Sequence, residues 1–361
     1  MYSPWTTRTS WENPDLPHWW SVSELRADHL DSITGGTIMF RKILSVVTIV
    51  AAGWGSPVTA IEPITLQFAH IYNTEDHWGQ VAEEFKAAVE ERSAGAITIK
   101  ISPSGTTGDW PQSIEGLRIG TNHIVLQSIG ALDRYGSIAG IEAFPYLIRD
   151  IDHFNKVYYG SVGKDLFEAI EEQSGFYITG AAYRGARHLS ANRSTPTLDE
   201  LAGLKLRVPP LKMYRQTWEN LGASPVPMGF AEVFTSLQHG LIDGQENPLE
   251  VVRNASLYEV QDYLMETSHV IGAMTLIFSS NYFNKLPEET RTILTEEGAR
   301  VMQAASARMI DTEAELKADL ISKGMEFVDV DLTEFRSALS DYAAKEFPDL
   351  QPWVSSIQSV K

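Results

Sequence analysis

After residue 60 the hydrophobic and polar residues alternate between segments with the two-residue period of β-strands and segments with the spacing of α-helices. Residues 64–69 alternate with a period of two, as do residues 96–102, and residues 124–128 form a short apolar run. Between them, residues 74–92 and 111–119 carry apolar positions at helical spacing, and Gly120 offers a left-handed C-cap to the second helix. The order strand, helix, strand, helix, strand predicts an α/β domain.

A second strand–helix run begins near Arg184. Thr197 opens a short helix of capping-box form that Gly203 ends, and the strand 204–208 follows with Arg207 on its polar face. Helix, Pro-punctuated strand and a second helix lead to the pair Asn247-Pro248 at the end of another strand. The helix–Gly–strand unit at 113–127 is echoed at 234–247, which favours two domains of similar design.

The chain becomes helical after residue 281. Residues 287–322 keep a helical period that only Gly298 interrupts. Two readings fit: two helices that meet at Gly298, or one helix that bridges both domains, and we favour the bridge. A strand at 325–330 and a last helix at 332–346 complete the expected elements.

The segment 39–60 has the layout of a signal peptide. Arg41 and Lys42 precede a short apolar run, and small residues at 58–60 suit a signal peptidase. The run is too short to span a bilayer, which needs about 20 residues. We therefore expect export to the periplasm, a mature chain from Ile61, and an upstream extension at 1–38 that is a mis-assigned start.

The length, net charge and Cys content of the chain limit the partners and sites that we expect. The chain has 361 residues, which suits two domains, and a net charge of −18, which argues against nucleic acid or an anionic membrane surface as partner. It contains no Cys, so it has no disulfide and no Cys-based metal site.

No catalytic signature is present in the sequence. G-x-S-x-G, Walker A, H-E-x-x-H and G-x-G-x-x-G motifs are all missing, and the nine His residues lack metal-ligand spacing. For Asp243 and Glu246 a role in a turn or at a helix start is a better interpretation than a role as a catalytic acid or base. We expect no catalytic residue, no metal and no cofactor.

The candidate chemistry is anion binding at strand ends, where open α/β sheets hold their ligands. The planar fork of Arg207 suits a carboxylate, and its alternative is an exposed arginine paired with a surface acid. Arg187 lies at an expected strand-to-loop crossing, with a structural ion pair as the alternative. Asn247 can donate and accept, Phe230 has a core role as its alternative, and His70 ends the first strand.

The run GLKLRVP followed by LGASPVPMGFAEVFTSLQHGLIDGQENP resembles the substrate-binding proteins of TRAP transporters, the DctP-like family. Further matches are YRGAR at 183–187, AFPYL at 143–147 and FNKLPEE at 283–289, and the similarity covers residues 62–350 in order.

The resemblance implies a two-domain, type II-like periplasmic binding protein with a cleft between the domains and a long domain-bridging helix. Domain I would comprise 61–183 plus about 272–310, and domain II 184–271 plus about 311–361. It also implies that Arg207 pairs with a ligand carboxylate, that Arg187 and Asn247 flank it, and that Phe230 forms a wall of the cleft.

The sialic-acid-binding members are similar across residues 207–247. Where they place a glutamate in a first-domain strand this chain has Ser128, and their cleft Asn meets His70 or Ile71. The resemblance therefore implies a different small carboxylate, such as a sugar acid, a hydroxy or keto acid, or a dicarboxylate.

The function expected is an extracytoplasmic receptor that delivers this acid to the membrane permease subunits of a TRAP transporter. The alternatives are a secreted α/β enzyme acting on a carboxylate and a ligand sensor for a membrane receptor. The resemblance implies a monomer, with a dimer as the alternative.

Overall fold

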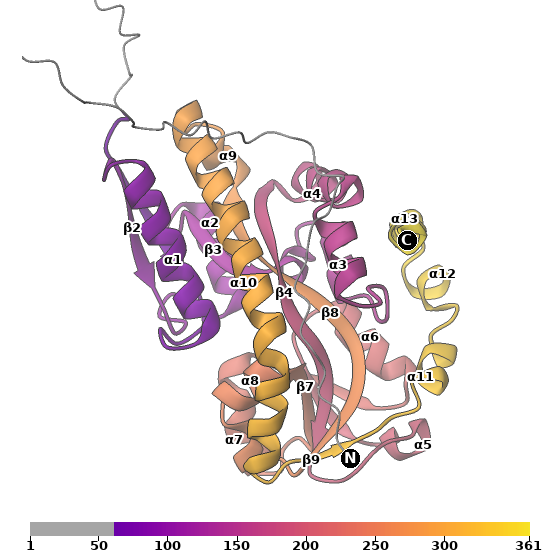
Figure 1. The fold of residues 1–361 in the computed structure, drawn as a ribbon. Coiled ribbons are helices and arrows are strands. Elements are labelled where there is room, and N and C mark those ends of the chain that lie inside the picture. Colours follow the sequence, from indigo (N-terminus) through magenta and orange to yellow (C-terminus); the bar gives the residue numbers. More distant parts are fainter. Residues whose placement is uncertain (1–60) are drawn as a thin grey trace, which may run out of the picture. The chain divides into compact units, whose positions relative to one another are not determined.

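The computed structural model describes residues 61–361 of the chain. The signal peptide expected at 39–60 and the extension at 1–38 lie outside the described residues. Nine strands form one mixed sheet (Figure 1), and the strands are β1 Ile64–Ala69, β2 Ile97–Ser102, β3 Ile124–Ser128, β4 Phe176–Ala191, β5 Lys205–Val208, β6 Ser224–Pro227, β7 Gly244–Pro248, β8 Tyr263–Ser279 and β9 Glu326–Val328.

The sheet has the order β2-β1-β3-β8-β4-β7-β5-β6, with β9 beside β8. The strands β1, β2 and β3 are mutually parallel, and so are β7, β5 and β6. Each parallel group joins one long strand in antiparallel fashion, β3 to β8 and β7 to β4, and β4 and β8 pair with each other. The α/β fold class is confirmed.

The α-helices lie before, between and after these strands, and their bounds are α1 His77–Arg92, α2 Trp110–Ile119, α3 Ile151–Tyr158, α4 Ser161–Ser174, α5 Leu198–Leu201, α6 Lys212–Asn220, α7 Val233–Gln238, α8 Leu249–Asn254, α9 Ser280–Phe283, α10 Glu288–Ser322, α11 Leu332–Ala338, α12 Tyr342–Glu346 and α13 Gln351–Ser359. The predicted echo is present in space. In both copies a helix is followed within two residues by a left-handed glycine, Gly120 or Gly240, and the next strand joins a long strand.

The bridging helix is confirmed as one continuous element. α10 runs 35 residues and packs against α1, β4 and α8 (Figure 1). Arg308 near its middle bonds Glu84 of α1, and Asp319 near its end bonds Arg253 of α8. Gly298 is no break, because a Cβ there would come within 2.8 Å of the Thr179 side chain, so the glycine lets the helix approach β4 closely.

The C-terminal prediction was partly wrong. The strand at 325–330 is confirmed as the shorter β9, but the single helix expected at 332–346 is two helices, and α13 follows them. The helix is interrupted between Ala338 and Tyr342, where the Tyr342 side chain turns inward and its hydroxyl donates to the Met213 carbonyl at 3.1 Å. α13 then packs against α4, and the ring of His153 bonds the Ile357 carbonyl.

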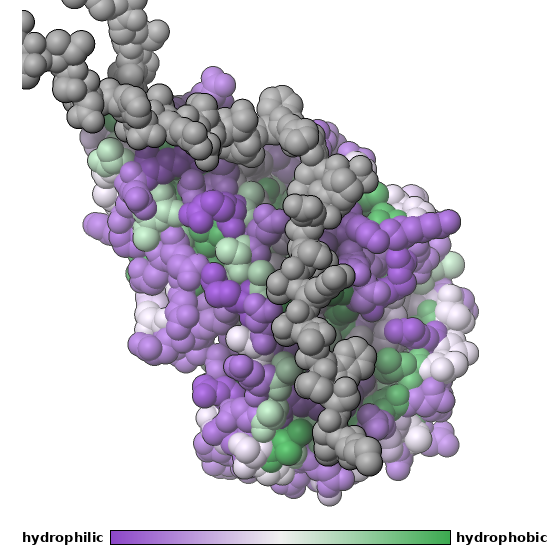
Figure 2. Space-filling model, in the orientation of Figure 1, coloured by the Kyte–Doolittle hydropathy of each residue, from purple (hydrophilic) through white to green (hydrophobic). Residues whose placement is uncertain are grey.

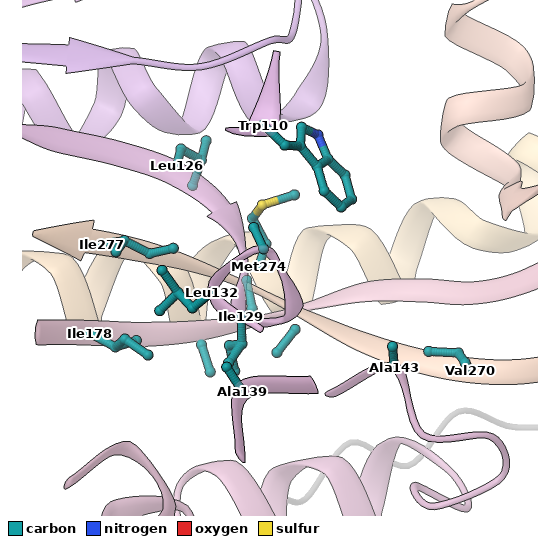
Figure 3. Packing of buried hydrophobic residues seen from close by; sticks show 14 of the residues in the cluster. Trp110, Leu126, Ile129, Leu132, Ala139, Ala143, Ile178, Val270, Met274 and Ile277 are labelled. Atoms are coloured by element: carbon teal, nitrogen blue, oxygen red, sulfur yellow. The ribbon is translucent and has the colours of Figure 1, made fainter. Parts of the chain in front are cut away.

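A large apolar core lies under the sheet's first half and its centre, and a smaller one lies beside α7 and α8. Figure 3 shows part of the large core, where Met274 of β8 lies below Trp110 at the start of α2. The face in Figure 2 is mostly hydrophilic outside the grey residues, in line with the acidic composition. Among residues 61–361 no helix combines the length and apolarity that a membrane crossing requires.

The buried histidine of β4 predicts acid lability. Burial lowers the pKa of His188 from 6.5 to about 3, and its Nδ1 accepts the Ser268 N–H at 3.4 Å, which requires the neutral ring. Between pH 6.5 and about 3 the unfolded chain therefore binds a proton at His188 that the folded chain does not bind. The contribution of the neutral ring to folding stability is fully present above pH 6.5 and is lost as the pH falls through this range. This histidine should contribute a slope of up to about 1.4 kcal/mol per pH unit.

Urea unfolding at pH 7 and pH 4.5 measures this slope. His188→Asn should lose about 2 kcal/mol less than the wild type between the two pH values. His239→Asn, at an exposed position, is the matched control and should follow the wild type. An unchanged slope in His188→Asn would contradict the assignment.

Candidate functional site

Arg207 is a buried cation whose bonded partner is neutral. It lies in β5 with 3% of its surface exposed, and its Nε and Nη2 both donate to the Met228 carbonyl, at 3.0 and 2.8 Å. It forms no ion pair with a carboxylate of residues 61–361. Burial lowers the pKa of Arg207 to about 10, so the side chain stays charged at neutral pH. The alternative of an exposed arginine paired with a surface acid is wrong.

Arg187 is held by a carboxylate. Its Nε donates to Glu246 Oε2 at 2.5 Å, and its Nη2 donates to Glu246 Oε1 at 2.8 Å and to the Glu246 carbonyl at 2.6 Å. Both side chains are at most 2% exposed. Burial alone would lower the pKa of Arg187 and raise that of Glu246, but their opposite charges outweigh it, and the pKa of Glu246 is about 2.

A neutral histidine completes this pair. His269 of β8 lies 2.9 Å from Glu246 Oε2 through Nε2 and 2.9 Å from the Thr267 hydroxyl through Nδ1. Burial lowers the pKa of His269, so the ring is neutral and its Nε2–H donates to the carboxylate. Arg187 is thus both a member of the candidate site and part of a structural ion pair.

The local backbone also differs from the prediction. Arg187 was expected at a strand-to-loop crossing, but it lies inside the 16-residue strand β4. The strand contains register shifts, one of them between Tyr183 and Ala186, where Gly185 adopts φ 88°. A bulge of this kind inserts one extra residue and resets the alternation of side chains. Gly185, which precedes Arg187, therefore marks a bulge in a continuing strand and not a strand end.

The same bulge brings a further arginine to the site. Tyr183 faces α10, where its hydroxyl donates to Glu313 at 3.0 Å. The extra residue then places Arg184 and Arg187, three apart in sequence, on the other face of the sheet. Arg184 is 4% exposed, and its guanidinium carbon lies 5.7 Å from the ring centre of Trp110.

Phe230 connects the two halves of the sheet. Its ring centre lies 5.7 Å from the Arg207 guanidinium carbon, and its backbone N–H donates to Asp109 Oδ2 at 3.0 Å. The other oxygen of Asp109 accepts the N–H of Trp110 at 2.8 Å and so caps α2. One carboxylate therefore joins the start of α2 to the turn that carries Phe230.

Asn247 lies in β7, which pairs with the strand β4 that carries Arg187. In the register of β7 and β4, Asn247 is opposite His188 and Pro248 is opposite Arg187. The side chain is 3% exposed, and its Nδ2 donates to Gln245 Oε1 at 2.5 Å. The amide is thus placed by its neighbour on the same strand.

Ser128 ends β3 and holds a carboxylate from another segment. Its hydroxyl donates to Glu142 Oε2 at 2.6 Å, and Glu142 Oε1 accepts the N–H of Ala273 at 3.1 Å. A Cβ at Gly272 would come within 2.3 Å of Glu142 Oε1, and one at Gly130 within 2.8 Å of Oε2, so both glycines make room for the carboxylate. Glu142 is 4% exposed, and its charge acts on the pKa of Arg187.

His70 follows β1 at the same edge of the sheet as the end of β3. It is 2% exposed and stacks on Tyr72, with ring centres 6.3 Å apart. Burial lowers the pKa of His70 to about 4, so its ring is neutral. Tyr72, Phe230 and Glu250 line a cavity of about 70 Å³, and burial raises the pKa of Glu250 to about 7, with Asp76 as the next cause.

The structure thus brings the predicted side chains into two linked groups. Arg207, Phe230, Arg187 and Asn247 lie on β4, β5, β7 and the turn after β6, while His70 and Ser128 lie at the ends of β1 and β3. Tyr72, which stacks on His70, lines one cavity together with Phe230 and so connects the two groups.

Sequence reasoning missed four neighbours of this site: Trp110, Glu142, Arg184 and Tyr214. The ring centre of Tyr214 lies 5.0 Å from the Arg187 guanidinium carbon. These four residues share no local sequence pattern, and only the packing brings them together.

Comparisons with known proteins give the same picture across most of the chain. Residues 68–348 match the family model for bacterial extracellular solute-binding protein, family 7, DctP. A solute-binding protein of Roseobacter denitrificans is 33% identical over 89% of this chain and 99% of its own length. The sialic acid-binding periplasmic protein SiaP of Vibrio cholerae is 30% identical over 75% of this chain and 85% of its own length.

Solved structures agree with the fold. A TRAP periplasmic solute-binding protein from Roseobacter denitrificans with bound L-galactonate has a TM-score of 0.78 and 32% identity, over 83% of this chain and all of that one. One from a Polaromonas species bound to D-erythronate has a TM-score of 0.77 and 31% identity, over 82% of this chain and 99% of that one.

Proposed function

Because the chain belongs to the bacterial extracellular solute-binding proteins of family 7, we propose that it is a receptor for a small hydroxylated carboxylate of the TRAP transport system. It would bind the acid outside the cytoplasm, after removal of the signal peptide at 39–60, and deliver it to the membrane permease subunits. The relatives bound to L-galactonate and D-erythronate support a sugar acid as the ligand class.

The observation that carries the proposal is the unmatched charge of Arg207. A buried cation is costly unless an opposite charge accompanies it, and the bonded partner of Arg207 is a neutral carbonyl. Glu246 already matches Arg187, so a ligand carboxylate is the natural complement of Arg207.

The free donors support the same ligand group. Of the five N–H groups of a guanidinium, Arg207 directs two at Met228. Arg187 Nη1 is buried and has no hydrogen-bond partner among residues 61–361. We infer that these N–H groups donate to the two oxygens of the ligand carboxylate. Asn247 would then hydrogen-bond the substituent next to the carboxylate, and the Phe230 ring would cover that substituent.

The remaining predicted residues line the other side. In this proposal Ser128 acts through Glu142, which it holds, and His70 faces the ligand from the end of β1. The two-domain division at 183/184, 271/272 and about 310/311 stays a prediction, with closure of the halves around the ligand as the transport signal. No catalysis is part of this proposal, and the protein acts as a monomer.

A thermal-shift screen over organic acids tests the function. At a concentration 100 times its Kd, a ligand stabilises by about 2.7 kcal/mol, which raises the Tm of a domain of this size by on the order of 5 °C. We expect this shift with L-galactonate or D-erythronate and none with erythritol, the uncharged polyol control. If no acid of any class shifts the Tm, the receptor assignment fails. Consumption of an acid would instead favour the secreted enzyme.

A further inference from the structure

A second set of hydrogen-bond donors lies beside Arg187 and Arg207 and plays no part in the contacts described for Arg207. Trp110 Nε1 and Arg184 Nε are both buried, and neither has a hydrogen-bond partner among residues 61–361. The two side chains are 9% and 4% exposed and lie against each other, 5.7 Å from guanidinium carbon to ring centre. A buried donor without a partner is unfavourable, so these two N–H groups are available to an oxygen atom from a bound molecule.

These donors lie next to the carboxylate anchor. Trp110 follows Asp109, which accepts the N–H of Phe230, and the Phe230 ring lies on Arg207. Arg184 reaches the same face of the sheet as Arg187 through the bulge in β4. In Figure 3 the indole nitrogen of Trp110 lies on the side of the ring away from Met274.

The chemistry of the two groups selects the atom they bind. An indole N–H and a guanidinium N–H can only donate, so the bound group must offer oxygen lone pairs. A second ligand carboxylate is disfavoured, because Asp109 adjoins Trp110 and the buried Glu250 already feels the charge of Arg184. A hydroxyl oxygen satisfies both donors without adding charge.

A hydroxyl also carries a proton that needs an acceptor. His70 supplies a candidate, because its ring is neutral and stacks on Tyr72, whose phenol lies in the field of Arg184. The phenol itself donates to the Met274 sulfur at 3.9 Å, below Trp110 in Figure 3. Donors and acceptor together suit an alcohol.

We propose that Trp110 and Arg184 form a hydroxyl-binding subsite for the part of the ligand that lies away from its carboxylate. The proposal rests on the proposed function and deepens it. It makes this chain selective for polyhydroxy acids over acids that carry a carboxylate and no distal hydroxyl.

Trp110→Phe tests the subsite, because it removes the N–H and keeps an aromatic ring. Titration calorimetry would compare L-galactonate and D-erythronate with their terminal-deoxy analogues. The variant should weaken binding of each hydroxy acid about 3- to 10-fold and leave the deoxy analogues unchanged. Arg184→Lys, which keeps the charge and removes Nε–H, should give the same pattern. Trp353→Phe, in α13, is the matched control and should bind as the wild type does.

The outcomes separate the subsite from the receptor assignment. An equal loss for the hydroxy acids and the deoxy analogues would mean that Trp110 acts only as a wall, and no loss would mean that it does not face the ligand. Either result refutes the subsite while the receptor function stands. Binding of succinate but of neither hydroxy acid also refutes it. If the wild type binds no carboxylate at all, the receptor function falls first and the subsite with it.

Discussion

Arg207→Ala is expected to abolish the stabilisation that acids confer and to weaken carboxylate binding by at least about 100-fold. Each charge-assisted hydrogen bond contributes roughly 1.5–3 kcal/mol, and a carboxylate on this guanidinium would lose two of them. The unligated variant should fold normally, because the change removes a buried charge whose bonded partner is a neutral carbonyl. Calorimetric titration with the best acid of the thermal-shift screen gives the affinity, and unfolding without ligand gives the stability.

Arg207→Lys refines this result. A lysine keeps the charge but offers no planar fork, so it should bind more weakly than the wild type and more tightly than the alanine variant. Near wild-type affinity in Arg207→Ala would remove Arg207 from the site and place the anchor on Arg187 or Arg184.

Glu246→Gln should be the most destabilising single change among the candidate site residues. It keeps the shape of the side chain but leaves the fully buried Arg187 charge without its partner, and breaking a buried pair in this way costs about 3–5 kcal/mol. The Tm should fall by on the order of 10 °C. The measurement is urea unfolding of the unligated protein at pH 7.

A matched control exists on the surface. Glu219→Gln breaks the exposed pair of Glu219 with Arg215, whose side chains are 44% and 42% exposed, and should cost about 0.5 kcal/mol or less. The double change Arg187→Met with Glu246→Leu should recover most of the loss, because it leaves no unpaired charge. A loss below about 1 kcal/mol in Glu246→Gln would show that Arg187 is matched by another group.

Periodicity was sufficient for the regular elements. The strand Ile64–Ala69 and the helix across Gly298 follow from local spacing, because Leu66 and Phe68 are buried two apart in the strand and the helix buries residues at helical spacing from Thr290 to Met309. The same logic failed at β4, where nearly every position is buried and no alternation marks the strand. There Arg187 was expected at a strand-to-loop crossing, although Gly180 and Gly185 only shift the register of a strand that continues.

The candidate site was predictable only where the resemblance supplied it. Arg207 is placed on a strand by the sequence, but its burial and its neutral partner depend on Met228, in a turn further along the chain. Glu246 was interpreted as a turn or helix-start residue, and its pairing with Arg187 joins two strands that only the sheet brings together. Such pairings leave no mark in local spacing.

Ser128 illustrates the same limit at a single position. Compared with relatives that carry a glutamate there, the serine suggests that the site has lost a carboxylate. The structure instead places the Glu142 carboxylate on the serine hydroxyl, at 2.6 Å. A comparison made one position at a time therefore misjudges the charge at the candidate site.

The two long strands also govern the order in which the sheet can be completed. β3 lies between β1 and β8, and its register pairs Val125 with Ile277, so its second neighbour comes from a much later part of the chain. Until β8 has emerged, β3 and β4 each leave an edge of unpaired backbone groups on a strand whose residues are almost all buried in the folded protein, and such edges are prone to edge-to-edge aggregation. A nascent or truncated chain that ends before residue 263 is thus an assembly hazard, and holding the emerging chain unfolded until its last third arrives would protect it.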